Sequence, residues 1–147
     1  MFHRILVATD GSELADKAVS KAIALAALFE AELVALTVVR RQPRSYMEGS
    51  SSVQSEELAR VDDGRAEQAR SMIEAVEKRA KARGIPVRTA TVKSNQIGDS
   101  IVAAARTHGS QLIVMASHGR RGLARAVLGS ATDHVLTHSE VPVLVLR

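Results

Sequence analysis

The sequence contains no cysteine among its 147 residues, and it is poor in aromatic residues, with two phenylalanines, one tyrosine and no tryptophan. The lack of cysteine excludes disulfide scaffolds, thiol catalysis and cysteine-based zinc or iron–sulfur sites, and it suits a reducing compartment. Proteins that bind single-stranded nucleic acids usually stack the bases on aromatic rings. The shortage of such rings therefore argues against this class of ligand.

Long apolar runs are also missing. The longest apolar stretch, residues 22–39, is interrupted by Glu30 and Glu32, so we expect no transmembrane helix. The apolar segment before Asp10 is too short for a signal peptide. The charge is nearly balanced, at 20 basic against 16 acidic residues, with no run of four basic residues, which gives little support to nucleic-acid binding. These features predict a cytoplasmic protein that does not enter membranes.

Short apolar runs alternate along the chain with longer segments whose apolar residues recur every three or four positions. The runs predict strands, and the longer segments predict amphipathic helices. The alternation predicts a single α/β domain over residues 1–147, with a five-stranded, mostly parallel sheet and helices on both faces. The expected strands are residues 5–7, 33–39, 87–92, 112–115 and 143–146, and the expected helices lie near 15–29, 58–80, 97–107 and 130–138.

The periodic pattern lapses between residues 40 and 64, a stretch that includes Pro43, Gly49 and three consecutive serines. Connections longer than about a dozen residues are usually either functional or disordered. We therefore expect a mobile loop here, and the pattern leaves open whether it is a lid or a disordered connection.

Ligands of open α/β sheets bind at the carboxyl ends of the strands, where neighbouring crossovers leave on opposite faces. The turn after the first strand, residues 8–13, has neither the GxGxxG pattern of dinucleotide folds nor the GxxxxGK[ST] pattern of P-loops. The segment after the fourth strand instead contains glycines and leads into a helix at Gly129 and Ser130. Helix N-termini and glycine backbones favour phosphate. Arg120, Arg121 and Arg125 could add positive charge there.

A purely structural interpretation of the same residues remains open. Residues 130–133, Ser-Ala-Thr-Asp, fit a capping box, and residues 10–13, Asp-Gly-Ser-Glu, fit an ordinary helix start. Under this interpretation the glycines only shape turns.

The spacing of these residues over the whole chain resembles that of the universal stress protein family. The resemblance lies in Asp10 after the first strand, residues 117–119 (Ser-His-Gly) after the fourth, nine residues to Gly129 and Ser130, and residues 141–145 (Val-Pro-Val-Leu-Val) at the end. It implies a sheet of order 3-2-1-4-5, a homodimer, and ATP or another adenine nucleotide, with or without Mg²⁺, between the loops that follow the first and fourth strands.

By position, the resemblance implies that Asp10 holds adenine or ribose and that Val38 contacts the base through its backbone. It also implies that the glycine loop holds ribose and phosphates. His118 could touch the ligand or orient the turn. The residues that we expect at the nucleotide are Ala8, Asp10, Val38, Ala116, His118, Gly119, Arg120, Gly129, Ser130 and Ala131.

One position departs from the family's G-x2-G-x9-G-[ST] loop, because Ala116 stands where the first glycine would be. If the position needs a positive φ, alanine is strained there, and if it needs close backbone approach, the methyl group crowds the nucleotide. If it needs neither, the fourth strand continues through Ala116. We expect binding that is retained but weakened.

His134 and His138 lie four residues apart on one predicted helix face. We interpret them as a solvent-facing pair, because a zinc site would need further ligands that the sequence does not supply. We expect no catalytic residues and no metal site of the chain's own, although slow ATP hydrolysis is not excluded.

The resemblance thus implies a dimeric, ATP-binding stress-response protein with a signalling or protective role. The alternative is a nucleotide-independent interaction module of the same fold. A nucleotide hydrolase or transferase is a weaker third hypothesis, because the SGGxDS and HxGH motifs are absent. The apolar segment at residues 143–146 predicts the dimer interface, since an uncovered edge strand invites pairing with another chain.

Overall fold

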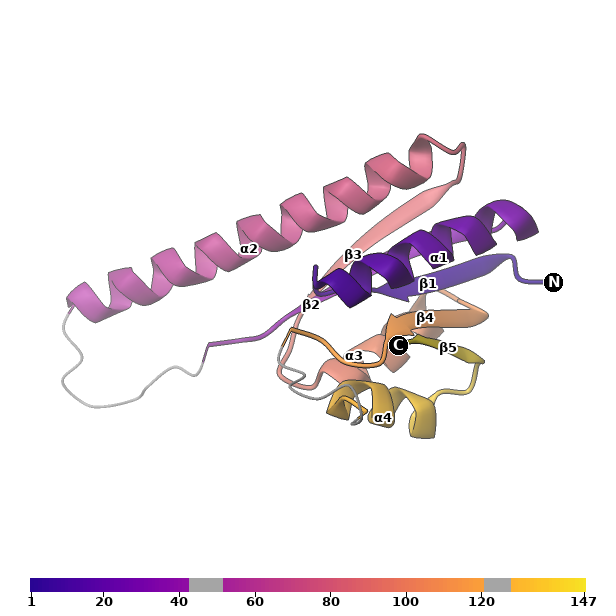
Figure 1. The fold of residues 1–147 in the computed structure, drawn as a ribbon. Helices are drawn as coiled ribbons and strands as arrows, with labels where there is room; N and C mark the ends of the chain where they lie inside the picture. Colours follow the sequence, from indigo (N-terminus) through magenta and orange to yellow (C-terminus); the bar gives the residue numbers. More distant parts are fainter. Residues whose placement is uncertain (43–51, 121–127) are drawn as a thin grey trace.

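The structure is a computed structural model that describes residues 1–42, 52–120 and 128–147. Strands and helices alternate along the chain, and all strand pairs are parallel, in the order β3-β2-β1-β4-β5 (Figure 1). The five-stranded α/β fold and the strand order are as predicted. The elements are β1 (Arg4–Ala8), α1 (Glu13–Phe29), β2 (Glu32–Val39), α2 (Ser52–Lys81), β3 (Val87–Lys93), α3 (Ile97–Thr107), β4 (Leu112–Ala116), α4 (Ser130–His138) and β5 (Val143–Leu146).

The sheet separates two apolar cores, one under α1 and α2 and the other under α3 and α4. Successive strand residues point to opposite faces, so Ile5 and Val7 pack in the first core while Leu6 packs in the second. The central strands are therefore apolar at nearly every position, as expected for strands covered on both sides.

The expected loop at residues 40–64 differs from the structure, because α2 already begins at Ser52. Residues 54–60 are rich in Glu, Leu, Ala and Arg, which favour helix in their own right. The first turns of α2 extend beyond the sheet (Figure 1), and Val53, Leu58 and Val61 stay exposed. The apolar residues of this segment therefore do not pack into the core. Residues 43–51, the rest of the expected loop, lie outside the described residues.

The chain leaves β1 and β4 in different directions. The chain that leaves β1 passes through α1 on one face of the sheet, whereas the chain that leaves β4 passes through α4 on the other, and β1 pairs with both β2 and β4. The carboxyl ends of β1 and β4 therefore form the topological switch point at which open α/β sheets bind ligands. Within the described ranges, no helix combines the length and apolar character needed to cross a membrane.

Candidate functional site

A cavity of about 460 Å³ lies at the carboxyl ends of β1, β2 and β4. Its size falls within the range of roughly 300–1,000 Å³ that is common for small-molecule sites. Helices α2 and α3 and the first turn of α4 complete its walls. All ten residues that the sequence predicted for the site line this cavity, namely Ala8, Asp10, Val38, Ala116, His118, Gly119, Arg120, Gly129, Ser130 and Ala131.

Asp10 joins the two loops that frame the cavity. Its Oδ1 accepts a hydrogen bond from the Ser12 backbone N–H (N···O 3.0 Å), and its Oδ2 accepts one from the Arg120 backbone N–H (2.8 Å). Ser12 in turn caps α1, because its Oγ accepts from the Ala15 N–H. The predicted helix start is therefore present, and the Asp10 carboxylate also ties the β1 loop to the β4 loop.

Gly119 is required at this junction for space. A Cβ at Gly119 would overlap Asp10 Oδ2, so a larger residue would have to displace the carboxylate. The backbone of the β4 loop here runs closely past the Asp10 carboxylate. The close approach seen here is to the Asp10 carboxylate, and close approach to a ligand stays a prediction.

Gly129 forms the other half of the loop. Its N–H donates to the Ser117 carbonyl oxygen (2.8 Å), and a Cβ would lie 3.1 Å from that oxygen. Gly129 is also the N-cap residue of α4 and offers no side-chain cap. The capping box expected at residues 130–133 is therefore wrong, since Ser130 already lies inside the helix. Thr132 Oγ1 instead donates to the Ala116 carbonyl oxygen (2.9 Å).

The first turn of α4 consequently presents backbone N–H groups to the cavity without a competing side-chain acceptor from the cap residue. The first N–H groups of any α-helix have no partner within the helix, and the helix dipole adds partial positive charge there. The end of the cavity at Ser130, Ala131 and Thr132 therefore has the polarity that suits an anion.

Ala116 is the last residue of β4, and its pairing partner on β5 is Leu146. Glu30 is the one non-glycine residue with positive φ in the described part of the chain, so Ala116 is not strained. The strand therefore continues through Ala116, which excludes the strain explanation considered above. The methyl group remains at the cavity wall.

His118 follows directly after the buried Ser117. Its Nδ1 lies 3.1 Å from Ser117 Oγ, within hydrogen-bonding distance. This contact fixes the orientation of an imidazole that lines the cavity. His118 is therefore both held by the turn and available to a ligand, and both roles suggested by the sequence stay open.

The cavity has an apolar wall and a cationic rim. Leu36, Val38, Ile97, Ile101 and Met115 form the wall. Arg40, Arg65 and Arg120 contribute the positive charge, and Asp10 is the single carboxylate among the lining residues that the structure describes. Sequence analysis missed both Arg40, which fell in the segment expected to be a loop, and Arg65, which lies on α2 just beyond that segment. The predicted Arg121 and Arg125 lie outside the described residues.

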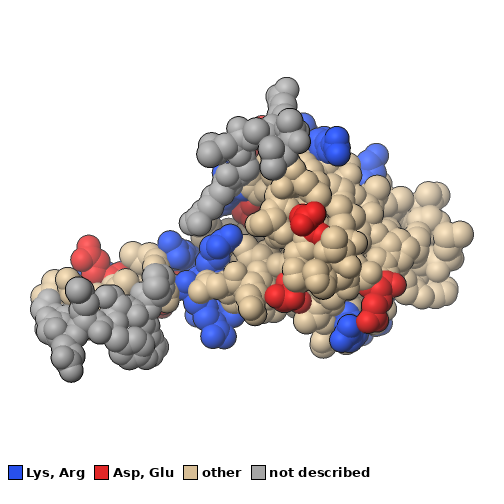
Figure 2. Space-filling model, turned by 90° about the horizontal axis from the view of Figure 1, so that it is seen from below, with Lys and Arg blue, Asp and Glu red and all other residues tan. Residues whose placement is uncertain are grey.

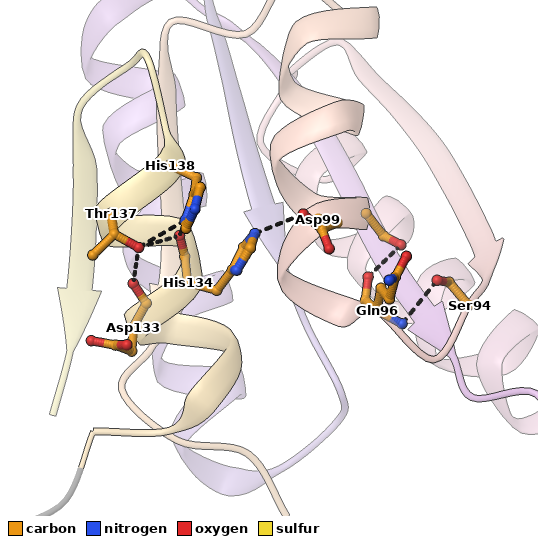
Figure 3. A network of polar contacts seen from close by, with 8 residues as sticks. Ser94, Gln96, Asp99, Asp133, His134, Thr137 and His138 are labelled. Atoms are coloured by element: carbon orange, nitrogen blue, oxygen red, sulfur yellow. Dashed lines mark hydrogen bonds and ion pairs between the residues drawn. The ribbon is translucent and has the colours of Figure 1, made fainter.

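The His134–His138 pair is only partly solvent-facing (Figure 3). The two rings stack with centroids 4.0 Å apart, but His134 packs on Gly98, and its Nε2 lies 2.7 Å from Asp99 Oδ1. His134 therefore joins α4 to the start of α3, which corrects the expectation for this residue. No cluster of three metal-ligating side chains occurs in the ranges that the structure covers.

Known proteins resemble this chain over all or nearly all of its length. The family model described as the universal stress protein family matches residues 1–147. Universal stress protein MJ0531 from Methanocaldococcus jannaschii is 32% identical, over 100% of this chain and 83% of that protein. Among solved structures, universal stress protein UspA from Lactobacillus plantarum is 25% identical, with a TM-score of 0.82 over 98% of this chain and 97% of that one.

A universal stress protein solved in complex with cAMP shares the fold at 24% identity, with a TM-score of 0.72 over 99% of this chain and 97% of that one. The family match covers every element that builds the cavity. The chain belongs to the universal stress protein family.

Proposed function

We propose that this chain is a dimeric, cytoplasmic stress-response protein that binds ATP or another adenine nucleotide at the carboxyl ends of β1 and β4. One observation carries the proposal: ten residues chosen from the sequence, spread from Ala8 to Ala131, line one cavity at the switch point of the sheet. A binding site is the simplest reason for such convergence.

The walls of the cavity match the parts of a nucleotide. The apolar wall with Val38 and Ile101 suits an adenine ring, and Asp10 lies beside it as an acceptor for ribose hydroxyl groups. The α4 N-terminus and the open backbone at Gly119 suit phosphate. The relative solved with cAMP indicates that this fold accommodates an adenine nucleotide. Any Mg²⁺ would enter with the phosphates.

The proposed output is binding rather than turnover. Asp10 is the one carboxylate among the described lining residues, and its two oxygens hold the β1 and β4 loops through backbone N–H groups. The remaining lone pair on each oxygen can accept from a ribose hydroxyl, and we assign Asp10 this binding role rather than that of a general base. A nucleotide can still signal by favouring one conformation of the loops or of the dimer, provided that it binds the two states with different affinity. The proposed role is therefore signalling or protection.

We place the dimer contact at β5. This strand lies at one edge of the sheet, and Leu144 is 36% exposed on it. An apolar edge strand is a template for pairing with a second chain. The opposite edge, β3, carries Arg88 and Lys93, and charged side chains discourage such pairing.

Mass spectrometry of the small molecules released from freshly purified protein tests the nucleotide proposal. Release of an adenine nucleotide in near-stoichiometric amount supports it. If the protein is purified without a bound nucleotide, equilibrium dialysis with labelled ATP tests the same proposal. If neither method detects nucleotide while the protein is folded and dimeric, the alternative of a nucleotide-independent interaction module is favoured.

A further inference from the structure

Helix α2 extends past the sheet at its amino end (Figure 1). Residues 53–65 are all exposed, and from Val53 onward the first buried residue of the helix is Ala69. Leu58 and Val61 are 40% and 42% exposed. Helical turns without tertiary packing are only marginally stable. A partner packed on this segment would therefore stabilise it.

One line of side chains runs along α2 from the cavity into this exposed segment. Leu58, Val61, Arg65, Gln68 and Met72 recur at steps of three and four residues, so they share one face of the helix. Arg65, Gln68 and Met72 line the cavity at the ends of the strands. Leu58 and Val61 continue the same line beyond the sheet, and they are an exposed apolar pair on it.

The sign of the charge reverses along the same part of α2. Residues 53–64 contain four acidic residues and one arginine, a net charge of −3 in a chain of net charge +4. Arg65 on α2 and Arg40 after β2 lie where this segment joins the body. Figure 2 shows Asp and Glu towards the end of the protrusion, and Lys and Arg at its junction with the body. Two antiparallel copies would bring the acidic end of one segment to the basic end of the other, so the chain itself carries the complementary charge.

The spacing of residues on this face is symmetric about Val61. Glu57 lies four positions before Val61 and Arg65 four positions after it, while Leu58 and Gly64 lie three positions to either side. In a pair with two-fold symmetry, residue i of one copy contacts residue j of the other, and j contacts i. An antiparallel pair centred on Val61 therefore places Glu57 opposite Arg65. It also places Leu58 opposite Gly64, which has open space around its Cβ position.

Both charged residues can take part in such a contact. Neither Glu57 nor Arg65 has a salt-bridge partner among the described residues. With its amide oxygen turned towards α2, Gln42 accepts hydrogen bonds from both terminal nitrogens of Arg65, at 3.0 and 3.1 Å. Each terminal nitrogen of a guanidinium carries a second N–H. Gln42 therefore orients Arg65 and leaves it able to donate to a carboxylate.

We propose that the face of α2 formed by Glu57, Leu58, Val61, Gly64 and Arg65 docks antiparallel on the same face of a second copy of this chain. Stable interfaces bury roughly 1,200–2,000 Å², and two apolar side chains per copy are too few for that. The contact is therefore transient, and at micromolar concentration the proposed dimers remain separate. At higher concentration it joins them, because a second two-fold contact on a dimer leads to larger assemblies.

Cross-linking through a single engineered cysteine tests the pairing, since the chain has no cysteine of its own. In Val61→Cys the two thiols face each other across the axis, and a short bismaleimide should join two copies at millimolar protein concentration. Asp63→Cys is the matched control, because Asp63 is also exposed but lies about 200° further round the helix. We expect Val61→Cys to cross-link at least about tenfold faster. Circular dichroism checks that each variant keeps its helices.

Charge reversal in the Val61→Cys background tests the antiparallel orientation. Glu57→Lys and Arg65→Glu should each slow the cross-linking by about threefold, and the two together should restore it. Glu56→Lys makes the same change in net charge about 140° away from Val61 on the helix, and it should have little effect. Leu144→Lys should keep the cross-link, because the α2 contact is separate from the proposed contact at β5.

Equal cross-linking of folded Val61→Cys and Asp63→Cys would overturn the proposal and favour a different protein with a basic helix as the partner of this face. A double reversal that does not restore the rate, or an equal effect of Glu56→Lys, would also overturn it, since these charges would then not set the orientation. Loss of the cross-link in Leu144→Lys would mean that the helices meet only within the β5 dimer, which contradicts a separate contact.

Discussion

The Oδ2 atom of Asp10 accepts a hydrogen bond from the backbone N–H of Arg120, 110 positions away in the sequence (2.8 Å). This bond closes the rim of the cavity between the loops that follow β1 and β4. It also depends on Gly119, because a Cβ there would overlap the same oxygen. The Asp10 carboxylate thus links the conformation of the glycine loop to the proposed ribose-binding position.

Replacement of Asp10 by alanine should affect both ligand and fold. Two backbone N–H groups lose a charged acceptor, which costs about 1–2 kcal/mol of the free energy of unfolding. ATP affinity should fall at least about tenfold, because the loop loses its anchor and the ribose its acceptor. Urea unfolding and calorimetry measure the two effects.

Asp16→Ala is the control for Asp10→Ala, since Asp16 lies on α1 and pairs on the surface with Arg79. Exposed ion pairs contribute about 0–1 kcal/mol, so this variant should bind ATP like the parent. If Asp10→Ala is destabilised but binds ATP normally, Asp10 serves the fold alone.

Ala116→Gly should tighten ATP by roughly tenfold, equivalent to about 1.4 kcal/mol of binding free energy. Because Ala116 continues β4 without strain, the expected gain comes from removing a methyl group at the cavity wall. Glycine within a strand should at the same time lower stability by about 0.5–1 kcal/mol. An unchanged dissociation constant in calorimetry would mean that the methyl group does not crowd the nucleotide.

Glu32 should make stability depend on pH at the opposite end of the sheet. Its hydrogen bond to Arg88 is the largest cause of a lowered pKa; burial opposes the shift, and Arg4 adds to it. A carboxylate whose folded pKa lies below its unfolded value stabilises the protein above the unfolded pKa, and this stabilisation disappears as the pH falls through the folded pKa.

Glu32→Gln should therefore be less stable than the parent at pH 7 by about 1–2 kcal/mol. The difference between the two proteins should shrink once the pH falls below the ordinary carboxyl value of 4.5. Denaturant unfolding of both proteins across this range checks the prediction. A difference that stays constant from pH 7 to pH 3 would assign the effect to packing rather than charge.

Leu144→Lys should convert the proposed dimer to a monomer, because it places a charge at the exposed apolar position of β5. Val143 and Val145 are less suitable targets, since both pack against the core under α3 and α4. Thr89→Lys, on the exposed opposite edge strand, is the matched control. Sedimentation equilibrium at high micromolar concentration should give monomer for Leu144→Lys and dimer for the parent and for Thr89→Lys. A dimer in all three proteins would place the interface elsewhere.

The sequence could predict those parts of the fold and site that depend on local pattern. Runs that are apolar on both faces, such as residues 33–36, predict buried strands. The spacing from Gly119 to Gly129 predicts the glycine loop that follows β4. The helical start of α2 was missed because the prediction relied on apolar periodicity, and this part of the helix buries no apolar face: Val53 and its apolar neighbours are exposed. Arg65 and the His134–Asp99 contact depend on which helix faces which neighbour, and periodicity alone does not determine that.

The most direct test of the nucleotide site is calorimetric titration of ATP into the parent, Gly119→Ala and Gly64→Ala. Gly64 lies in α2 with open space around its Cβ position, so Gly64→Ala should stabilise the helix by about 0.5–1 kcal/mol and leave ATP binding unchanged. The account predicts binding by the parent and by Gly64→Ala, and a loss of at least about tenfold in Gly119→Ala, whose Cβ displaces the Asp10 carboxylate. Equal ATP affinity in all three folded proteins, or no ATP binding by the folded parent, would contradict it.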